Sequence, residues 1–208
     1  MEDIATKILE TAERLFLRYG IRNISMDDIS GELGISKKTI YQFFNDKNEI
    51  VCLIAKRFFK EKKEEFDKIY VEGENSIERL YMSTLKAREI FSKINPHILF
   101  DIKKYYEGAW ALYLDYEKSV MFEGTISILE DGIKEGLFRP DINVKILATL
   151  RVEEVKLAFD QLIFSDDEFN FREVQMQILE HFFYGIVTEK GYAMLNEYKK
   201  NAVTNDQI

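Results

Sequence analysis

The sequence is poor in residues that break helices and in residues that form cross-links. It holds 2 prolines and 10 glycines in 208 residues. An interior glycine costs a helix about 1 kcal/mol relative to alanine and a proline about 3 kcal/mol, so this scarcity favours long helices. The single cysteine, Cys52, excludes an intramolecular disulfide. It lies in the apolar run EIVCLIAKRFF and is expected to be a small core residue.

The residue patterns of common enzyme sites are also missing. The only histidines are His97 and His181, and neither has a glutamate three positions before it, as helical di-iron sites require. One cysteine and two histidines cannot supply the usual ligands of a zinc site. No Gly-x-Ser-x-Gly motif, phosphate loop or dinucleotide fingerprint occurs. We therefore expect that the protein is no enzyme and has no catalytic residues, metal or cofactor.

Long hydrophobic runs are absent as well. No apolar stretch approaches the roughly 20 residues that a membrane-spanning helix needs. The acidic residues Glu2 and Asp3 precede a helical pattern, whereas a signal peptide begins with basic residues. We expect a soluble, cytoplasmic protein without a membrane partner.

Positive charge is scarce over the whole chain but not over its first third. The net charge is −8, from 29 Lys and Arg residues against 37 Asp and Glu residues. Residues 1–65 contain twelve of each sign, so the excess of negative charge lies entirely after residue 65. An anionic partner should therefore meet the first third of the chain.

Apolar residues recur at helical spacing along the chain. Spacings of three and four predict a first helix over residues 3–19 that ends at Gly20. A kink near Tyr116–Ser119 is left open. No alternation typical of a strand persists, so the predicted fold class is all-α. The further predicted helices cover residues 25–33, 36–44, 47–71, 76–93, 97–105, 107–136, 144–164 and 171–190.

The second and third predicted helices form a closely linked pair. Ser25 with Asp28 three residues later has the pattern of a capping box. Gly34 is expected to end this helix in a left-handed conformation, and Ser36 is the expected N-cap of the next. Two helices joined by a tight glycine turn describe a helix-turn-helix. From spacing alone, an ordinary helical hairpin with a solvated lysine pair remains an equal alternative.

Residues 4–50 resemble the N-terminal domain of the TetR family of transcriptional regulators. The resemblance rests on Phe16, Gly20, Ser25 and the run ISGELGISKKTIYQFFNDKNEI. Within this run, Tyr41, Phe44 and Lys47 fall at the family's positions. It implies an N-terminal three-helix DNA-binding head with a helix-turn-helix, followed by a larger helical ligand-binding and dimerisation body. We place the head at residues 1–46 and the body at residues 47–208.

The resemblance also implies roles for individual residues. Ser25, Tyr41 and Lys47 would contact phosphates, and Lys38 would contact a phosphate or a guanine. Phe43 departs from the family, which often has His or Tyr there, so an apolar contact with a thymine methyl or a sugar is expected instead. The predicted DNA-binding set is Ser25, Ser36, Lys37, Lys38, Thr39, Tyr41, Gln42, Phe43 and Lys47.

Two segments near the C-terminus have broad apolar faces. Residues 144–164 and 171–191 carry apolar residues on more than one side, which predicts burial on more than one side. The resemblance implies that the last two long helices form a homodimer as a four-helix bundle, while burial within the monomer stays open. The predicted interface residues are Leu150, Leu157, Ile178, Phe182 and Ile186.

The middle helices are rich in aromatic residues. Most of these are expected in the core, but tyrosine and tryptophan carry polar groups that need partners when buried. Such a cluster suits a mainly apolar pocket with a few hydrogen-bonding points. The predicted effector-binding set is Tyr81, Phe100, Tyr105, Trp110, Tyr113, Phe122 and Phe159.

Together these expectations describe a ligand-responsive regulator. It would be a repressor that a small, largely apolar effector releases from a near-palindromic double-stranded DNA operator. The alternative is a helical ligand-binding or interaction module without sequence-specific DNA binding.

Overall fold

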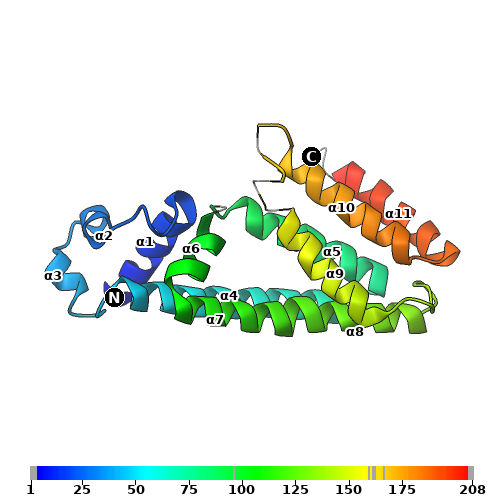
Figure 1. Ribbon diagram of the computed structural model, residues 1–208, viewed down its shortest axis with the longest axis horizontal. Coiled ribbons are helices and arrows are strands. Elements are labelled where there is room, and N and C mark those ends of the chain that lie inside the picture. The colour runs from blue at the N-terminus through cyan, green and yellow to red at the C-terminus, as the bar shows by residue number, and fades with distance from the viewer. Residues whose placement is uncertain (1–3, 96, 159, 161–162, 166, 206–208) are drawn as a thin grey trace. The chain divides into compact units, whose positions relative to one another are not determined.

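The computed structural model describes residues 4–95, 97–158, 160, 163–165 and 167–205. Its regular structure is helical, and the one pairing of extended backbone within these residues is an isolated bridge between Phe138 and Val187. The predicted all-α fold class is thus confirmed (Figure 1). In chain order the helices are α1 (Ile4–Tyr19), α2 (Met26–Leu33), α3 (Lys37–Ile40), α4 (Lys47–Glu72), α5 (Ser76–Ser92), α6 (His97–Tyr105), α7 (Glu107–Tyr116), the π-helix η1 (Glu117–Phe122), α8 (Glu123–Lys134), α9 (Val144–Leu157), α10 (Phe171–Ile186) and α11 (Glu189–Asn205).

Most helix boundaries agree with the sequence pattern. Helices α1, α4, α5 and α6 begin and end within one residue of the predicted bounds. The long predicted helix over 107–136 is divided by η1, a wider π-helical turn at the place where a kink was left open.

Three predicted helices were too long. Regular α-helix in α3 ends at Ile40, although turn-type hydrogen bonds continue to Phe44. Helix α9 ends at Leu157 rather than 164, and the backbone N–H of Asp160 then makes a turn-type hydrogen bond to the carbonyl oxygen of Leu157 at 3.0 Å. Helix α10 ends at Ile186, since Val187 is extended and pairs with Phe138.

Helix α11 was missed by the sequence pattern. Its start depends on Thr188, whose Oγ1 accepts a hydrogen bond from the backbone N–H of Gly191 at 3.1 Å. The same hydroxyl donates to the carbonyl oxygen of Gly136 at 2.8 Å. A threonine that satisfies an early helical N–H is a typical N-cap, and Leu195 then places α11 against the core with no exposed surface.

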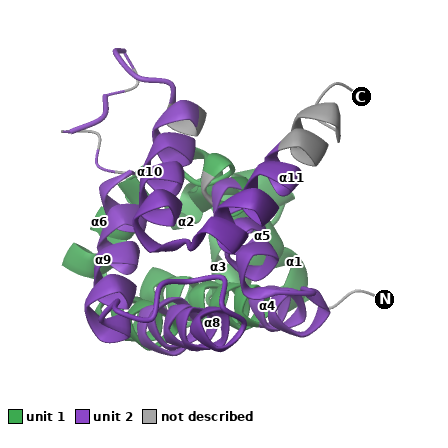
Figure 2. Ribbon diagram, turned by 90° about the vertical axis from the view of Figure 1, so that its right-hand side faces the viewer, with its two compact units in different colours: residues 1–63, 89–116 green, residues 64–88, 117–208 purple. Residues whose placement is uncertain are grey.

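The described chain divides into two compact units, residues 1–63 with 89–116 and residues 64–88 with 117–208 (Figure 2). The divisions fall within α4 and α5 and between α7 and η1. The first unit thus contains α6 and α7 beside the three N-terminal helices. The functional division into a head of residues 1–46 and a body of 47–208 stays a prediction.

Each unit has its own hydrophobic core. In the first, Ile8, Phe16, Ile29 and Ile40 join the three N-terminal helices, and Ile50 adds the start of α4. Burying such side chains contributes about 1.5–3 kcal/mol each relative to exposure. The apolar stripe read from the sequence therefore faces this core.

The core of the second unit centres on α8, α10 and α11. Its fully buried side chains include Leu129, Phe138, Phe183 and Leu195. A Cβ at Gly132 in α8 would run into the ring of Phe138, so glycine is required for this approach. None of the described helices combines the length and hydropathy needed to cross a membrane.

Candidate functional site

The N-terminal helix pair is fixed by side-chain caps. The backbone N–H of Asp28 donates to Ser25 Oγ at 3.2 Å, and the backbone N–H of Ser25 donates to Asp28 Oδ2 at 2.7 Å. This reciprocal pair confirms the predicted capping box. The hydrogen bonds from the Ser25 side chain and backbone lower the pKa of Asp28 below its ordinary value, so its carboxylate is charged at neutral pH and favours the start of α2.

The turn between α2 and α3 also follows the sequence prediction. Gly34 has φ 65° and ψ 28°, in the left-handed region that favours glycine. Ser36 Oγ then accepts from the backbone N–H of Thr39 at 3.1 Å and caps α3. The result is a helix-turn-helix with both helix starts capped.

Most of the predicted DNA-binding residues lie in α3, at its N-cap or in the turn that follows it. Lys37, Lys38 and Gln42 are exposed, and the rings of Tyr41 and Phe43 are 47% and 42% exposed. Ile40 and Phe44 are buried beneath them. Donors for phosphates and base edges thus lie on one side of the short helix, with apolar anchors on the other.

Lys37 already has an acidic neighbour. Its Nζ lies 2.9 Å from Oδ2 of Asp27 in α2, and this hydrogen bond raises the pKa of Lys37. Both side chains are exposed, where ion pairs contribute little. A DNA phosphate can therefore compete with Asp27 for the ammonium group.

Lys47 is placed differently from the other predicted contacts. Its half-buried ammonium group donates to the carbonyl oxygen of Ile21 at 2.6 Å and lies 5.6 Å from the centre of the Phe16 ring. Burial lowers the pKa of Lys47, while nearby Asp101 and Asp28 act in the opposite direction. The cation at the start of α4 thus has compensation within the protein and does not depend on a bound phosphate.

The predicted effector-binding aromatics do not come together. Trp110 and Tyr113 stack at 4.9 Å between ring centres in the first unit, where Phe100 and Tyr105 are exposed. Tyr81 is buried in the core of the second unit. Phe122 packs against that core, and Phe159 lies outside the described residues. The prediction grouped these residues by nearness in sequence, but most serve as packing in separate places.

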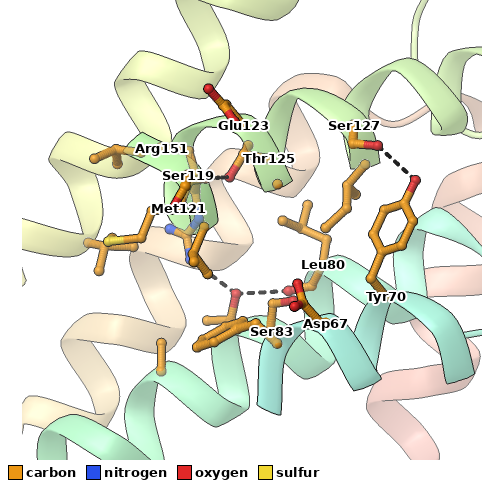
Figure 3. A pocket seen from close by; sticks show the side chains of 18 residues that line it. Asp67, Tyr70, Leu80, Ser83, Ser119, Met121, Glu123, Thr125, Ser127 and Arg151 are labelled. Atoms are coloured by element: carbon orange, nitrogen blue, oxygen red, sulfur yellow. Dashed lines mark hydrogen bonds between the residues drawn. The ribbon is translucent and has the colours of Figure 1, made fainter. Parts of the chain in front are cut away.

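The second unit instead contains a cavity of about 340 Å³ (Figure 3). Its volume lies within the range of ligand pockets. Second-unit segments of α4 and α5, together with η1, α8 and α9, contribute its walls. The lining residues are Phe66, Asp67, Tyr70, Leu80, Ser83, Thr84, Ala87, Ser119, Val120, Met121, Glu123, Gly124, Thr125, Ser127, Ile128, Arg151, Val152 and Val155.

Tyr70 closes one side of this cavity through polar contacts. Its hydroxyl oxygen lies 2.7 Å from Ser127 Oγ and 2.7 Å from Asp131 Oδ2 (Figure 3 draws the first). The hydrogen bond from Tyr70, followed by that from Lys134, lowers the pKa of Asp131. The ring is therefore held in place where α4 meets α8.

Arg151 lines the cavity but could not be recognised as a buried residue from the sequence pattern. It is 6% exposed, and its guanidinium donates to Thr84 Oγ1 at 3.1 Å and to Glu154 Oε2 at 3.5 Å. Burial lowers the pKa of Arg151 and raises that of Glu154, because both charged forms lose water. In sequence, an Arg and a Glu three residues apart on a helix resemble an exposed surface pair, so no signal indicated a buried one.

The predicted interface residues divide between core and surface. Phe182 and Ile186 are 3% and 1% exposed in the core of the second unit, so they have no surface left for a second copy. These two side chains are thus buried within one copy of the chain, as the alternative to an interface role describes. Leu150 and Leu157 are exposed and Ile178 is half-buried. Leu157 and Ile178 line an open groove of about 700 Å³ along α9 and α10.

Metal binding has no geometric support in the described residues. No group of three or more His, Cys, Asp or Glu side chains among them is placed to hold an ion. Among the described residues, the candidate sites are the exposed residues of α3 and the turn after it, the cavity lined by Arg151, and the groove along α9 and α10.

Comparisons with known proteins fit this arrangement. A family model described as "Bacterial regulatory proteins, tetR family" matches residues 8–52, from within α1 to the start of α4. Over 185 residues the chain is 24% identical to the HTH-type transcriptional regulator YvaF of Bacillus subtilis (strain 168), covering 88% of this chain and 96% of YvaF. Over 144 residues it is 26% identical to the HTH-type transcriptional repressor KstR2 of Rhodococcus jostii (strain RHA1), covering 68% and 71% of the two chains.

The fold is also similar to that of solved regulators. A transcriptional regulator from Saccharomonospora viridis, solved in complex with choline, superposes with a TM-score of 0.77 at 23% identity. The match covers 91% of this chain and 100% of the other. The likeness therefore extends from the helix-turn-helix through most of the remaining helices.

Proposed function

Because the chain belongs to the TetR family and is a DNA-binding transcriptional regulator, we propose that it is a homodimeric repressor of a near-palindromic operator. A small, largely apolar effector would release it from DNA. The protein would act in the cytoplasm, where bacterial DNA lies. The observation that carries the proposal is the capped helix pair, which presents Lys37, Lys38 and Gln42 on one exposed face.

That face has the chemistry for two kinds of contact. Lysine ammonium groups neutralise phosphates, which gives affinity that falls steeply with salt. Gln42 offers the amide that pairs with adenine in the major groove, and lysine favours guanine. A four-residue helix carries few such contacts, so two copies on two half-sites are needed for useful affinity.

An exposed apolar stripe on α9 supports the dimer. Ile146, Leu150 and Leu157 are 63%, 46% and 40% exposed, and their spacings of four and seven place them on one helix face. Contiguous apolar surface of this kind marks an interaction site, and most soluble oligomers are symmetric dimers. The proposed interface is therefore this stripe with the α9–α10 groove, without Phe182 or Ile186.

The cavity supports effector binding, but with other residues than the aromatic set. Its walls include η1, α8 and α9, so a ligand would contact the π-helical turn directly. A ligand changes DNA affinity only by binding one conformation better than another, and coupling of about 1–3 kcal/mol changes affinity five- to 150-fold. The S. viridis regulator holds choline, which supports a small molecule in a protein of this fold.

Fluorescence anisotropy with labelled DNA from upstream of the protein's own coding sequence tests the proposal. We expect salt-sensitive binding that protects two related half-sites, and a sedimentation mass near twice 24.6 kDa. A monomer at micromolar concentration would refute the dimer. If neither the upstream DNA nor any selected sequence binds with salt sensitivity, the protein is a helical ligand-binding module instead.

A further inference from the structure

The cavity of the second unit has mainly apolar walls, with several hydroxyl side chains and three charged residues among its lining. Phe66, Leu80 and Ile128 provide apolar surface. The carboxylates of Asp67 and Glu123 also line the cavity, but both residues are exposed to solvent. Arg151 is the buried charge in the lining, and Figure 3 places it among the side chains around the cavity. A ligand in the cavity can therefore reach a buried cation.

Arg151 is only partly neutralised by its surroundings. Its guanidinium has five N–H donors, and its polar partners among the described residues are Thr84 Oγ1 at 3.1 Å and Glu154 Oε2 at 3.5 Å. The contact to Glu154 is long for a charge-assisted hydrogen bond, which is usually 2.7–2.9 Å. Donor capacity thus remains on a buried cation.

A second buried polar group lies close to the same point. Arg151, Thr84, Glu154 and Gln175 all line a small void of about 10 Å³ beside the main cavity. Gln175 is 7% exposed, and its Oε1 has no hydrogen-bond partner among the described residues. Buried polar groups normally have partners, but Gln175 does not line the main cavity and its Oε1 can only accept a hydrogen bond, so Arg151 is the charged donor available to a ligand in that cavity.

We propose that the effector is a small carboxylate with an apolar body, whose carboxylate binds the guanidinium of Arg151. The planar fork of arginine matches a carboxylate in two parallel hydrogen bonds. At about 30 Å³ for each water-sized group, the 340 Å³ cavity accommodates on the order of ten non-hydrogen atoms. The inference rests on the proposed function, because it names the effector class of a ligand-responsive regulator.

Glu154 supplies the charge balance that this binding requires. An incoming anion replaces Glu154 on Arg151 and leaves a 9% exposed carboxyl group without its cation. Burial already raises the pKa of Glu154, while Arg151 on α9 and His181 on α10 lower it. Losing the Arg151 contact raises this pKa further, so Glu154 takes up a proton as the ligand carboxylate binds.

Calorimetric titration with three probes of equal chain length tests the head group. Octanoate, octanol and octylamine differ only in their polar end, and octanoate has ten non-hydrogen atoms. We expect octanoate to bind the full-length wild-type protein about ten- to hundredfold tighter than octanol, since hydrogen bonds to charged groups contribute that much. Octylamine should bind more weakly still. Repeating the octanoate titration in buffers of different ionisation enthalpy should reveal net proton uptake.

Variants locate the effect at Arg151. The double variant Arg151→Met with Glu154→Met removes both charges together, so it leaves no unpaired buried ion, and it should lose the preference for octanoate. Lys156→Met is the matched control, because Lys156 lies on the same helix, pairs with Glu117 and Glu153, and does not line the cavity. That variant should retain the preference.

The wild-type comparison decides the inference even if the double variant does not fold. Octanol or octylamine binding as tightly as octanoate would overturn it, as would no binding of octanoate. Preference for octanoate that persists in a folded double variant would also overturn it. The proposed function fails separately, through absence of salt-sensitive operator binding, and it survives if an uncharged or cationic compound releases the DNA.

Discussion

Replacing Lys47 by methionine separates a structural role from a DNA-binding role of this side chain. Methionine keeps an apolar stem of similar length beside Phe16 but removes the ammonium group. The carbonyl oxygen of Ile21 then loses the donor that lies 2.6 Å away. If Lys47 also contacts a phosphate, as the family resemblance implies, the same substitution weakens binding to every DNA sequence alike.

The magnitude of the structural effect follows from two opposing terms. A hydrogen bond from a charged donor stabilises by about 1.5–3 kcal/mol. A cation at the N-terminus of a helix costs about 0.3–1 kcal/mol, and Lys47 is the first residue of α4. Both act beside the burial of the ammonium group, which lowers the pKa of Lys47 and so disfavours its charged form in the folded protein. Lys47→Met should therefore lower the free energy of unfolding by only about 1 kcal/mol.

Two measurements test the two roles of Lys47. Chemical denaturation gives the change in unfolding free energy, and anisotropy titrations over a range of salt concentrations give the slope of log affinity. Each lost phosphate contact lowers the magnitude of that slope by about 0.9, or about 1.8 for the two copies of a dimer. Lys38→Met is the control, because Lys38 is exposed and makes no hydrogen bond or ion pair with another described residue.

The control should reduce the salt slope while changing the unfolding free energy by no more than about 0.5 kcal/mol. An unchanged unfolding free energy in Lys47→Met would refute the role assigned to the Ile21 contact. An unchanged slope would refute the phosphate contact, and an altered base preference would show that Lys47 reaches a base instead.

Three further experiments test other parts of the structure. Gln42→Ala should relax specificity at one position of each half-site, measured by binding to a library of single-base operator variants. Gly132→Ala should destabilise by about 1–3 kcal/mol through overpacking, whereas Gly124→Ala in the same helix has space and should not. Asp131 has a lowered pKa, so its stabilisation is present at neutral pH and is lost as pH falls below about 4; Asp131→Asn should flatten that acid-dependent loss in denaturation experiments.

The helix-turn-helix could be read from the sequence because its determinants are local. Ser25 with Asp28 and Gly34 act within a few residues of chain, and both the capping box and the left-handed turn are present. Local hydrogen bonds and backbone conformation depend little on distant contacts. The same locality explains the close agreement of α4 and α6 with their predicted bounds.

The end of α10 and the presence of α11 were harder to predict, because contacts between residues far apart in the sequence determine them. Val187 leaves the helical conformation to pair with Phe138, some fifty residues earlier. Thr188 then bonds to Gly136 while it caps α11. The apolar pattern in the sequence continues past the end of α10. It indicates which residues are buried, but not which residues they contact.

The proposed effector site depended on tertiary structure for a related reason. Trp110 and Tyr113 satisfied the sequence criteria for a pocket but stack on each other. Arg151 looked like a surface residue but lies buried beside Thr84, 67 residues away in sequence. A cavity forms where packed helices leave volume unfilled. The spacing of residues within one helix does not predict where that volume will be.

The sequence by itself determined the all-α fold, the helix-turn-helix and the resemblance of residues 4–50 to a family of DNA-binding domains, because these follow from helical periodicity, caps and a motif of fixed spacing. Only the tertiary structure decided which apolar residues are core and which remain exposed on α9. It also decided that the cavity is lined by a buried arginine and by none of the predicted aromatic set. Burial depends on how helices far apart in the sequence pack together. Whether a charged side chain is buried decides how strongly it interacts with a partner or ligand.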